Sequence, residues 1–259
     1  MNRDIADELA FNFRAHGRHG RTDRVQLTPA QTRMVARTAA RTPEVMVKVL
    51  SSGANSAKAV QRHLDYVTRN GAVELYNEEG EVMTGQNAVA GISDDWMLDL
   101  EEAGATNTLG DRRRQEAPRL VHKLVFSMPP GTKPEKVLAA VQTFAREEFA
   151  LRNRYVMALH TDEPHPHVHV IVKAMGEDGR RLNIKKAHLK EWRVKFAHHL
   201  RQEGVAANAT PRPFRGHPGH ATPSVIHRLR AREGMPADLT LRSPGGGVRD
   251  WPQRGPRVR

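Results

Sequence analysis

Histidines and carboxylates are concentrated in one short stretch of this sequence, residues 159–172 (LHTDEPHPHVHVIV). Alternate side chains of a strand point to the same side, so His167 and His169 are expected to project together from an apolar strand. The short segment before them can fold back and bring His160 alongside. Three neutral imidazoles can hold one divalent ion and leave positions open for water or phosphate oxygens, as a catalytic metal site requires.

Two neighbours of these histidines have less direct roles in this interpretation. Asp162 is expected to orient one imidazole without itself binding the ion. His165 lies between two prolines, which disturb the strand, so it is interpreted as a neighbour of the site rather than a ligand. On the residues alone, two alternatives stay open: a surface loop of solvated histidines and a purely structural zinc ion.

A covalent mechanism would need a nucleophile other than cysteine, because the chain has none. A three-histidine site on a basic protein favours phosphodiester chemistry. Of the three tyrosines, Tyr66 lies beside the apolar stripe of an expected helix and near Arg62, His63 and Arg69, which could hold phosphates. A tyrosine in a helix is more often half-buried packing, so both interpretations of Tyr66 are open at this point.

The composition favours an anionic partner. The 259 residues include 41 Lys and Arg against 29 Asp and Glu, which gives a formal charge of +12. Nucleic acid is therefore the first candidate and an acidic membrane the second. The lack of cysteine excludes a disulfide scaffold and a thiolate zinc finger. No apolar run approaches the ~18 residues that span a bilayer, and the N-terminus lacks the apolar core of a signal peptide, so we expect a cytoplasmic protein without membrane insertion.

Composition also divides the chain into three parts. Residues 1–43 are rich in arginine and poor in large apolar residues, which predicts a basic N-terminal arm. Residues 44–210 carry the strand and helix patterns of a folded domain. Residues 211–259 are rich in Pro, Gly and Arg and cannot bury enough apolar surface, so they are predicted to form a mostly disordered basic tail.

Within the domain, strands and helices follow one another without a regular parallel repeat. Strands are expected at residues 45–50, 73–76, 120–128, 155–159, 168–172 and 182–184, and helices at 55–69, 134–149 and 185–202. A further amphipathic helix is expected in the arm, at residues 28–42. Residues 78–119 show no clear periodicity and are interpreted as an insertion or long connection. The pattern predicts an α+β fold with a largely antiparallel central sheet and flanking helices.

Three stretches of the chain occur in an order that points to a known family. They are RHLDYVTRNG at residues 62–71, FSMPPG at 126–131 and HTDEPHPHVH at 160–169. This ordered trio resembles the motif pattern of relaxases, the mobilisation endonucleases of conjugative plasmids and integrative elements. More narrowly, it is similar to the subgroup that contains the T-DNA border-nicking endonuclease. The resemblance covers roughly residues 45–216.

The resemblance implies a metal-dependent DNA transesterase with the sandwich fold of the HUH endonucleases. Tyr66 matches the nucleophile, which attacks the scissile phosphate, stays linked to the DNA 5′ end and later religates the strand. His160, His167 and His169 match the metal ligands, and either Asp162 or His160 would accept the tyrosyl proton. The implied cofactor is a divalent ion, Mg²⁺ or Mn²⁺, with Zn²⁺ as an alternative.

The expected DNA contacts extend beyond these motifs. Ser127 matches a family contact to DNA near the nick. Arg62 and Arg69 could hold phosphates, and Lys185 and Lys186 open a basic helix that would contact the backbone without reading sequence. The implied partners are single-stranded DNA at an origin of transfer, an accessory DNA-binding protein, a coupling protein and type IV secretion machinery, with export of the protein covalently bound to DNA.

Three other functions stay open on the sequence. The first is a zinc-stabilised nucleic-acid-binding module without cleavage activity. The second is a rolling-circle replication initiator, which shares the tyrosine chemistry. The third is a metallohydrolase in which a bound water, rather than Tyr66, attacks the phosphate.

Overall fold

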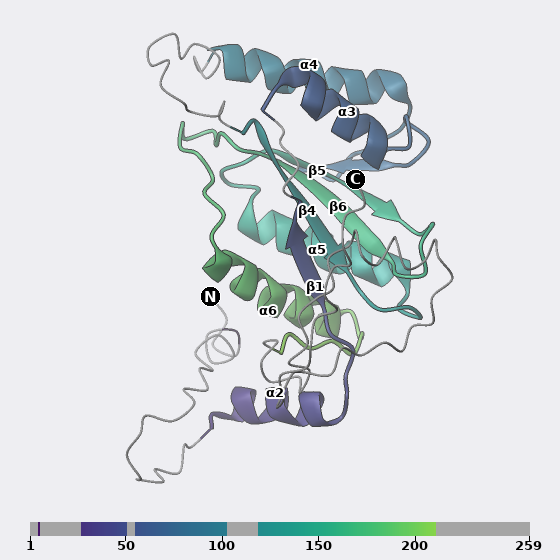
Figure 1. Cartoon of the computed structure of the whole chain (residues 1–259), viewed down its shortest axis with the longest axis vertical. Helices are drawn as coiled ribbons and strands as arrows, with labels where there is room; N and C mark the ends of the chain where they lie inside the picture. The colour runs from purple at the N-terminus through teal and green to yellow at the C-terminus, as the bar shows by residue number, and fades with distance from the viewer. Residues whose placement is uncertain (1–4, 6–26, 51–54, 103–118, 211–259) are drawn as a thin grey trace, which may run out of the picture. The chain divides into compact units, whose positions relative to one another are not determined.

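The central element is a six-stranded antiparallel sheet with strand order β1-β4-β6-β5-β2-β3 (Figure 1). The computed structural model describes residue 5 and residues 27–50, 55–102 and 119–210. The strands are Met46–Val49 (β1), Leu75–Asn77 (β2), Val82–Met83 (β3), Val121–Ser127 (β4), Tyr155–His160 (β5) and His167–Lys173 (β6). The helices are Pro29–Ala39 (α2), Ala57–Val67 (α3), Gln86–Glu102 (α4), Pro134–Glu148 (α5) and Lys186–Gln202 (α6). The predicted α+β class with an antiparallel sheet and flanking helices is confirmed.

The two faces of the sheet belong to different hydrophobic clusters. Leu124, Met157 and Val170 face the larger cluster, which includes the buried stripes of α5 and α6. Ala158 and Ile171, at alternate positions on the same strands, face a smaller cluster that includes α3 and α4. Figure 1 shows α3 and α4 together on one side of the sheet, with α5 and α6 away from them. Strand alternation therefore lets the same three strands contribute to both layers.

Helix α3 is fixed at both ends by its own sequence. Ser56 caps the first turn with its side chain. Val60, Leu64 and Val67 are fully buried against the sheet. The helix ends in a run of positive φ values at residues 69–71, where the backbone turns sharply away. The last helical turn, which carries Tyr66, is therefore held at a defined place over the sheet.

The β5–β6 hairpin sets the position of the three expected metal ligands. His160, the last residue of β5, is paired with His167, the first residue of β6. His169 follows at the next position on the same face and is paired with Ala158. On its other side β6 pairs with β4, so that Ser127 lies opposite His167. All four polar side chains therefore belong to one end of the central strands.

Two stretches differ in detail from the expected pattern. Residues 78–119, which were interpreted as an insertion or long connection because they show no clear periodicity, contain β3 and α4. Helix α4 buries Val89 and Trp96. Acidic residues and Gly91 obscure this apolar spacing in the sequence, and the helix is stabilised by packing against α3. Residues 182–184 do not form a strand. The Leu182 N–H instead donates a hydrogen bond to the Ala174 carbonyl in an irregular segment.

Helix α2 lies within the part that was assigned to the basic arm. Thr28 and Gln31 form a capping box at its start, and near its end the Thr38 hydroxyl lies 2.7 Å from that of Thr210. The three-part division of the chain stays a prediction, and the expected disorder of residues 211–259 lies outside the described residues. Within the described residues, no helix has the length and apolar character needed to cross a membrane.

Candidate active site

The three histidines of the hairpin converge as the strand spacing predicts. One nitrogen from each of His160, His167 and His169 lies within 4.8 Å of the others. Their ring centroids are 4.6–5.2 Å apart. His165 is exposed and is not part of this group. The backbone of the hairpin alone therefore builds a compact cluster of three imidazoles.

Backbone carbonyls orient two of these imidazoles. His160 Nε2 donates to the carbonyl of Val67, at 2.6 Å, and His167 Nδ1 donates to the carbonyl of His165, at 3.0 Å. Each bond fixes the proton on one ring nitrogen and leaves the other unprotonated, which is how metal-binding histidines are usually prepared. His169 Nδ1 is buried and has no hydrogen-bond partner.

Burial favours the neutral form of two of these imidazoles, His160 and His169. Burial, together with the neighbouring imidazoles, lowers the pKa of His169 to about 3. Burial also lowers the pKa of His160. Neutral imidazole is the form that binds metal ions. The three converging nitrogen donors and the lowered pKa values of His160 and His169 therefore fit a divalent ion held by the three histidines.

Tyr66 reaches this cluster from the last turn of α3. Its side chain is 56% exposed, so the ring is open to solvent rather than enclosed by packing. Its ring lies edge-on to that of His169 with 6.1 Å between centroids, and the guanidinium of Arg69 lies 5.0 Å from the Tyr66 ring centre. A solvent-accessible phenol, an arginine and the three imidazoles therefore share one end of the sheet.

Arg69 connects Tyr66 with the hairpin. It forms a 2.5 Å ion pair with Asp162, which lowers the pKa of the Asp162 carboxyl, and the same nitrogen lies 3.4 Å from His160 Nδ1. An ion bound at that imidazole nitrogen would have to displace this contact. Arg69 adopts a φ of 52°, a conformation that is costly for residues other than glycine. Asp162 was expected to orient an imidazole. The structure places it on Arg69, while the Val67 carbonyl orients His160.

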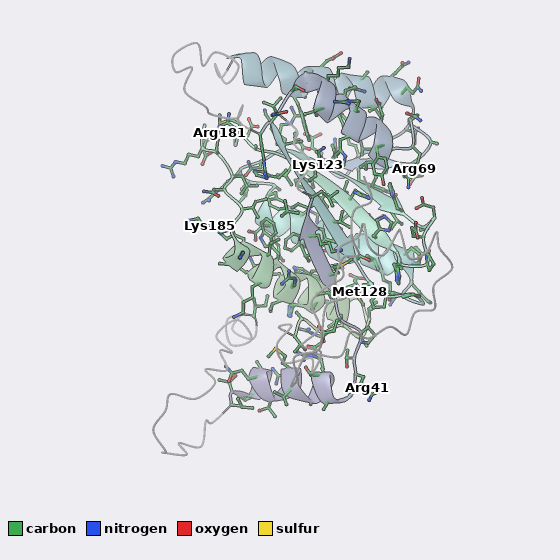
Figure 2. The ribbon with its side chains drawn as sticks, in the orientation of Figure 1. Arg41, Arg69, Lys123, Met128, Arg181 and Lys185 are labelled. Atoms are coloured by element: carbon green, nitrogen blue, oxygen red, sulfur yellow. The ribbon has the colours of Figure 1, made fainter. Side chains whose placement is uncertain are left out.

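The other expected DNA contacts fall into two groups. Ser127 is buried on the sheet face that carries the imidazoles, and Arg62 is exposed one turn before Tyr66 on α3. Lys185 and Lys186, in contrast, line a pocket of about 500 Å³ at the opposite end of β4 and β6. Figure 2 labels Lys185 on the opposite side of the view from Arg69.

Two residues of the site were missed or misplaced by the sequence argument. His63 was considered a phosphate contact, but it is buried under α3, its ring lies near those of Tyr66 and His169, and burial lowers its pKa to about 4. Lys123 was not considered, although it is buried in β4. A charged lysine inside the expected strand LVHKLVFSM, residues 120–128, was the signal that could have found it.

Comparisons with known proteins identify a family and several relatives. The family model described as "Relaxase: MobA/VirD2-like, nuclease domain" matches residues 66–204. The T-DNA border endonuclease VirD2 of Agrobacterium fabrum is 25% identical over 223 residues, which are 78% of this chain and 49% of that protein. VirD2 of Rhizobium radiobacter is 23% identical over 186 residues, covering 67% of this chain and 43% of that protein. The chain thus spans about half the length of these relatives.

Among solved structures, the MobM relaxase domain bound to plasmid pMV158 oriT DNA, with Mn present, is similar to this chain at 12% identity and a TM-score of 0.44. The match covers 73% of this chain and 98% of the MobM domain. The family model covers more than half of the present chain, starting at Tyr66 and including the whole histidine cluster. The chain therefore belongs to the relaxase family, in the group of MobA/VirD2-like nuclease domains.

Proposed function

We propose that this protein is a DNA relaxase that nicks single-stranded DNA at an origin of transfer through attack by Tyr66. The observation that carries the proposal is the position of the exposed Tyr66 ring, which lies beside His169 of the three-imidazole cluster. The T-DNA border endonucleases that the chain resembles support DNA as the substrate. The formal charge of +12 is also suited to binding a polyanion.

The proposed reaction exchanges one phosphodiester bond for another. The Tyr66 oxygen attacks the scissile phosphorus, the bond to the 3′ oxygen breaks, and that oxygen leaves as a 3′-hydroxyl after taking up a proton. The tyrosyl proton passes to a nearby base. Of the two candidates, His160 and Asp162, only Asp162 can accept it while the ion is bound, because one nitrogen of His160 would hold the ion and the other donates to the Val67 carbonyl. The product is a 5′-phosphotyrosyl adduct, and the reverse attack by a 3′-hydroxyl religates the strand without ATP.

Two features of the site would lower the barrier of this reaction. Arg69 lies over the Tyr66 ring, where its charge stabilises the phenolate as it forms. A divalent ion held by His160, His167 and His169 would polarise the scissile phosphate and neutralise developing charge. Three nitrogen donors suit a transition-metal ion better than Mg²⁺, which prefers oxygen ligands.

The proposal extends to the cellular role. Single-stranded transfer DNA is the proposed substrate, and an accessory DNA-binding protein, a coupling protein and type IV secretion machinery are the proposed partners. The protein would act in the cytoplasm and be exported while covalently linked to the strand. Relatives named as T-DNA border endonucleases favour this role over that of a rolling-circle initiator.

The proposal is tested with single-stranded oligonucleotides tiled across the DNA that flanks this gene, incubated with the protein and Mn²⁺, Mg²⁺ or Zn²⁺. Wild-type protein should form a denaturant-stable protein–DNA species that EDTA abolishes. Tyr66→Phe should reduce its formation by at least about 10³-fold. Tyr76→Phe, which removes a hydroxyl bonded to Glu74 in β2, is the matched control and should retain activity.

The alternative functions give different results in the same experiment. Cleavage that survives in Tyr66→Phe would indicate a metallohydrolase that uses water. DNA binding without cleavage by the wild type, together with zinc-dependent thermal stability, would indicate a zinc-stabilised binding module. Either result would overturn the role proposed for Tyr66.

A further inference from the structure

A second group of cations lies on the same sheet face as the histidine cluster, nearer the β1 edge. Lys123 of β4 is two positions along its strand from Val125, which is paired with His169 on one side and with Lys48 of β1 on the other. Paired residues and those two positions apart share a face. Lys123, Lys48 and His169 therefore project to the side of the sheet that α3 partly covers.

Lys123 is the unusual member of this group. Its side chain is 6% exposed, yet within the described part of the chain it forms no hydrogen bond and no ion pair. Its ammonium is also not among the fully enclosed, unpartnered polar atoms of the described residues, all of which are imidazole nitrogens. The stem of Lys123 is therefore buried, while its charge remains accessible to an anion.

A second buried lysine on the same face has a carboxylate partner, as buried lysines usually do. Lys173 of β6 is 4% exposed and forms an ion pair with Glu177, with 3.8 Å between Nζ and the carboxylate oxygen. Buried charges in folded proteins are normally paired in this way. Lys123 has the same depth and faces the same side, but no carboxylate accompanies it among the described residues.

The charged neighbours of Lys123 are also cationic. Burial and then the charge of Arg62, on α3 above it, lower the pKa of Lys123. Lys123 in turn adds to the effect of burial in lowering the pKa of His63, whose ring lies 6.3 Å from that of His169. Lys48 and Arg62 are both exposed beside it. A buried lysine among further cations is a site prepared for an anionic ligand.

The position of this group relates it to the proposed reaction. Two strand residues correspond to about 7 Å, so Lys123 lies roughly that distance along the sheet from the level of His169. In Figure 2 Lys123 is labelled between Arg69 on one side and Arg181 and Lys185 on the other. A single strand whose scissile phosphate lies at Tyr66 would place a neighbouring phosphate within reach of these cations.

We propose that Lys123, with Lys48 and Arg62 at its rim, forms a binding site for one backbone phosphate of single-stranded DNA adjacent to the scissile phosphate. This inference rests on the proposed function, because it takes DNA as the ligand. The contact is to the backbone, so it fixes the register of the strand and carries no base specificity. Lys123 is a positioning residue, since it holds the strand while Tyr66 reacts.

The test removes the charge from each side of the contact in turn. Binding is measured by fluorescence anisotropy in a Tyr66→Phe background, with an oligonucleotide that the wild type cleaves. Single methylphosphonate linkages, which are neutral, replace the phosphates one at a time. At one position next to the nick, the neutral linkage should weaken binding by about 5–20-fold when Lys123 is present. Lys123→Met should weaken binding of unmodified DNA by a similar factor and should be insensitive to the linkage at that position.

Lys173→Met is the matched control because it removes an equally buried lysine that has its own carboxylate. It should bind DNA as the Tyr66→Phe parent does and should keep the full methylphosphonate penalty. If the fold-losses of affinity caused by Lys123→Met and by the neutral linkage multiply at every position, Lys123 contacts none of these phosphates, and the proposal is overturned. Unchanged binding by Lys123→Met would do the same.

Two further measurements separate this proposal from other failures. Lys123→Met should melt at the same temperature as its parent or above it, and Lys123→Arg, which keeps the charge, should retain the position-specific penalty even if the Met variant folds poorly. With a 15-residue oligothymidylate, Lys123→Met should reduce the slope of log affinity against log salt by about 0.7, and Lys173→Met should not. This measurement needs no cleavage. A reduced slope without any Tyr66 adduct would retain the phosphate site and reject the proposed chemistry, whereas an unchanged slope with normal adduct would do the reverse.

Discussion

The two faces of the central sheet are built from the same strands but differ in the side chains that they bury. On the α5 and α6 side, Phe126 packs against Phe144 and Phe196 with ring centroids 4.8 and 5.3 Å apart, in the larger of the two hydrophobic clusters. On the α3 side, the apolar cluster is smaller, and at one end it gives way to His160 and His169. One face therefore supplies most of the stabilising burial, and the other can carry polar groups whose burial is costly.

The largest expected difference in stability between the two faces comes from the aromatic cluster around Phe126. Phe126→Ala should lower the free energy of unfolding by about 3–5 kcal/mol, because it removes a fully buried ring and leaves a cavity. Met46→Ala, on the α3-side face and 38% exposed, should cost less than about 1 kcal/mol. Urea unfolding followed by circular dichroism measures both. Equal losses would show that the two faces contribute alike.

A metal ion bound by the histidines on the α3 side of the sheet should stabilise the folded protein. At a free Mn²⁺ or Zn²⁺ concentration of 100 times Kd, the wild type should gain about 2.7 kcal/mol, observed as a higher melting temperature. His169→Ala should abolish this gain. His165→Ala, which removes an exposed neighbour outside the ligand group, should preserve it. If both variants lose the gain, His165 belongs to the ligand set and the assignment of three ligands is wrong.

The turn after α3 should be sensitive to a single methyl group. Gly71 has a φ of +86°, and an added Cβ would lie 2.6 Å from backbone atoms of Gly85 and Gln86. Gly71→Ala should therefore cost about 1–3 kcal/mol and slow the formation of the Tyr66 adduct, because the end of α3 must shift. Gly80→Ala has a similar φ but open space around it, so it should cost less and leave adduct formation unchanged. Thermal melts and initial cleavage rates measure the two effects.

The pH dependence of stability should come partly from the polar face. Burial, and then the charge of Lys123, lower the pKa of His63 from 6.5 to about 4. The unfolded chain thus binds a proton between these values while the folded protein does not, and the free energy of unfolding falls as the pH drops from 6.5 to 4. In EDTA, His63→Leu should reduce this fall by about 1–2 kcal/mol. Urea titrations at pH 7 and pH 4.5 test this, and an unchanged fall would show that His63 is protonated in the folded state.

Local patterns in the sequence determined much of the fold and one half of the site. The alternation of 167–173 placed His167 and His169 on one face, and the short hairpin loop brought His160 beside them, because strand geometry depends only on neighbouring residues. The 3.6-residue stripe of α3 likewise placed Val60, Leu64 and Val67 toward the sheet. Helix α4 escaped prediction because its stripe is weak and its burial depends on α3.

The other half of the site was decided by tertiary structure. No spacing in the sequence relates Tyr66 to a hairpin about a hundred residues later. Their approach depends on the packing of α3 across β5 and β6. The same packing buries His63. Among the described residues it brings no carboxylate to Lys123, while Glu177 reaches Lys173 on the same face. Residue types and local periods fix which way a side chain points, but only the complete arrangement of helices on the sheet fixes which distant groups, and which charges, it meets.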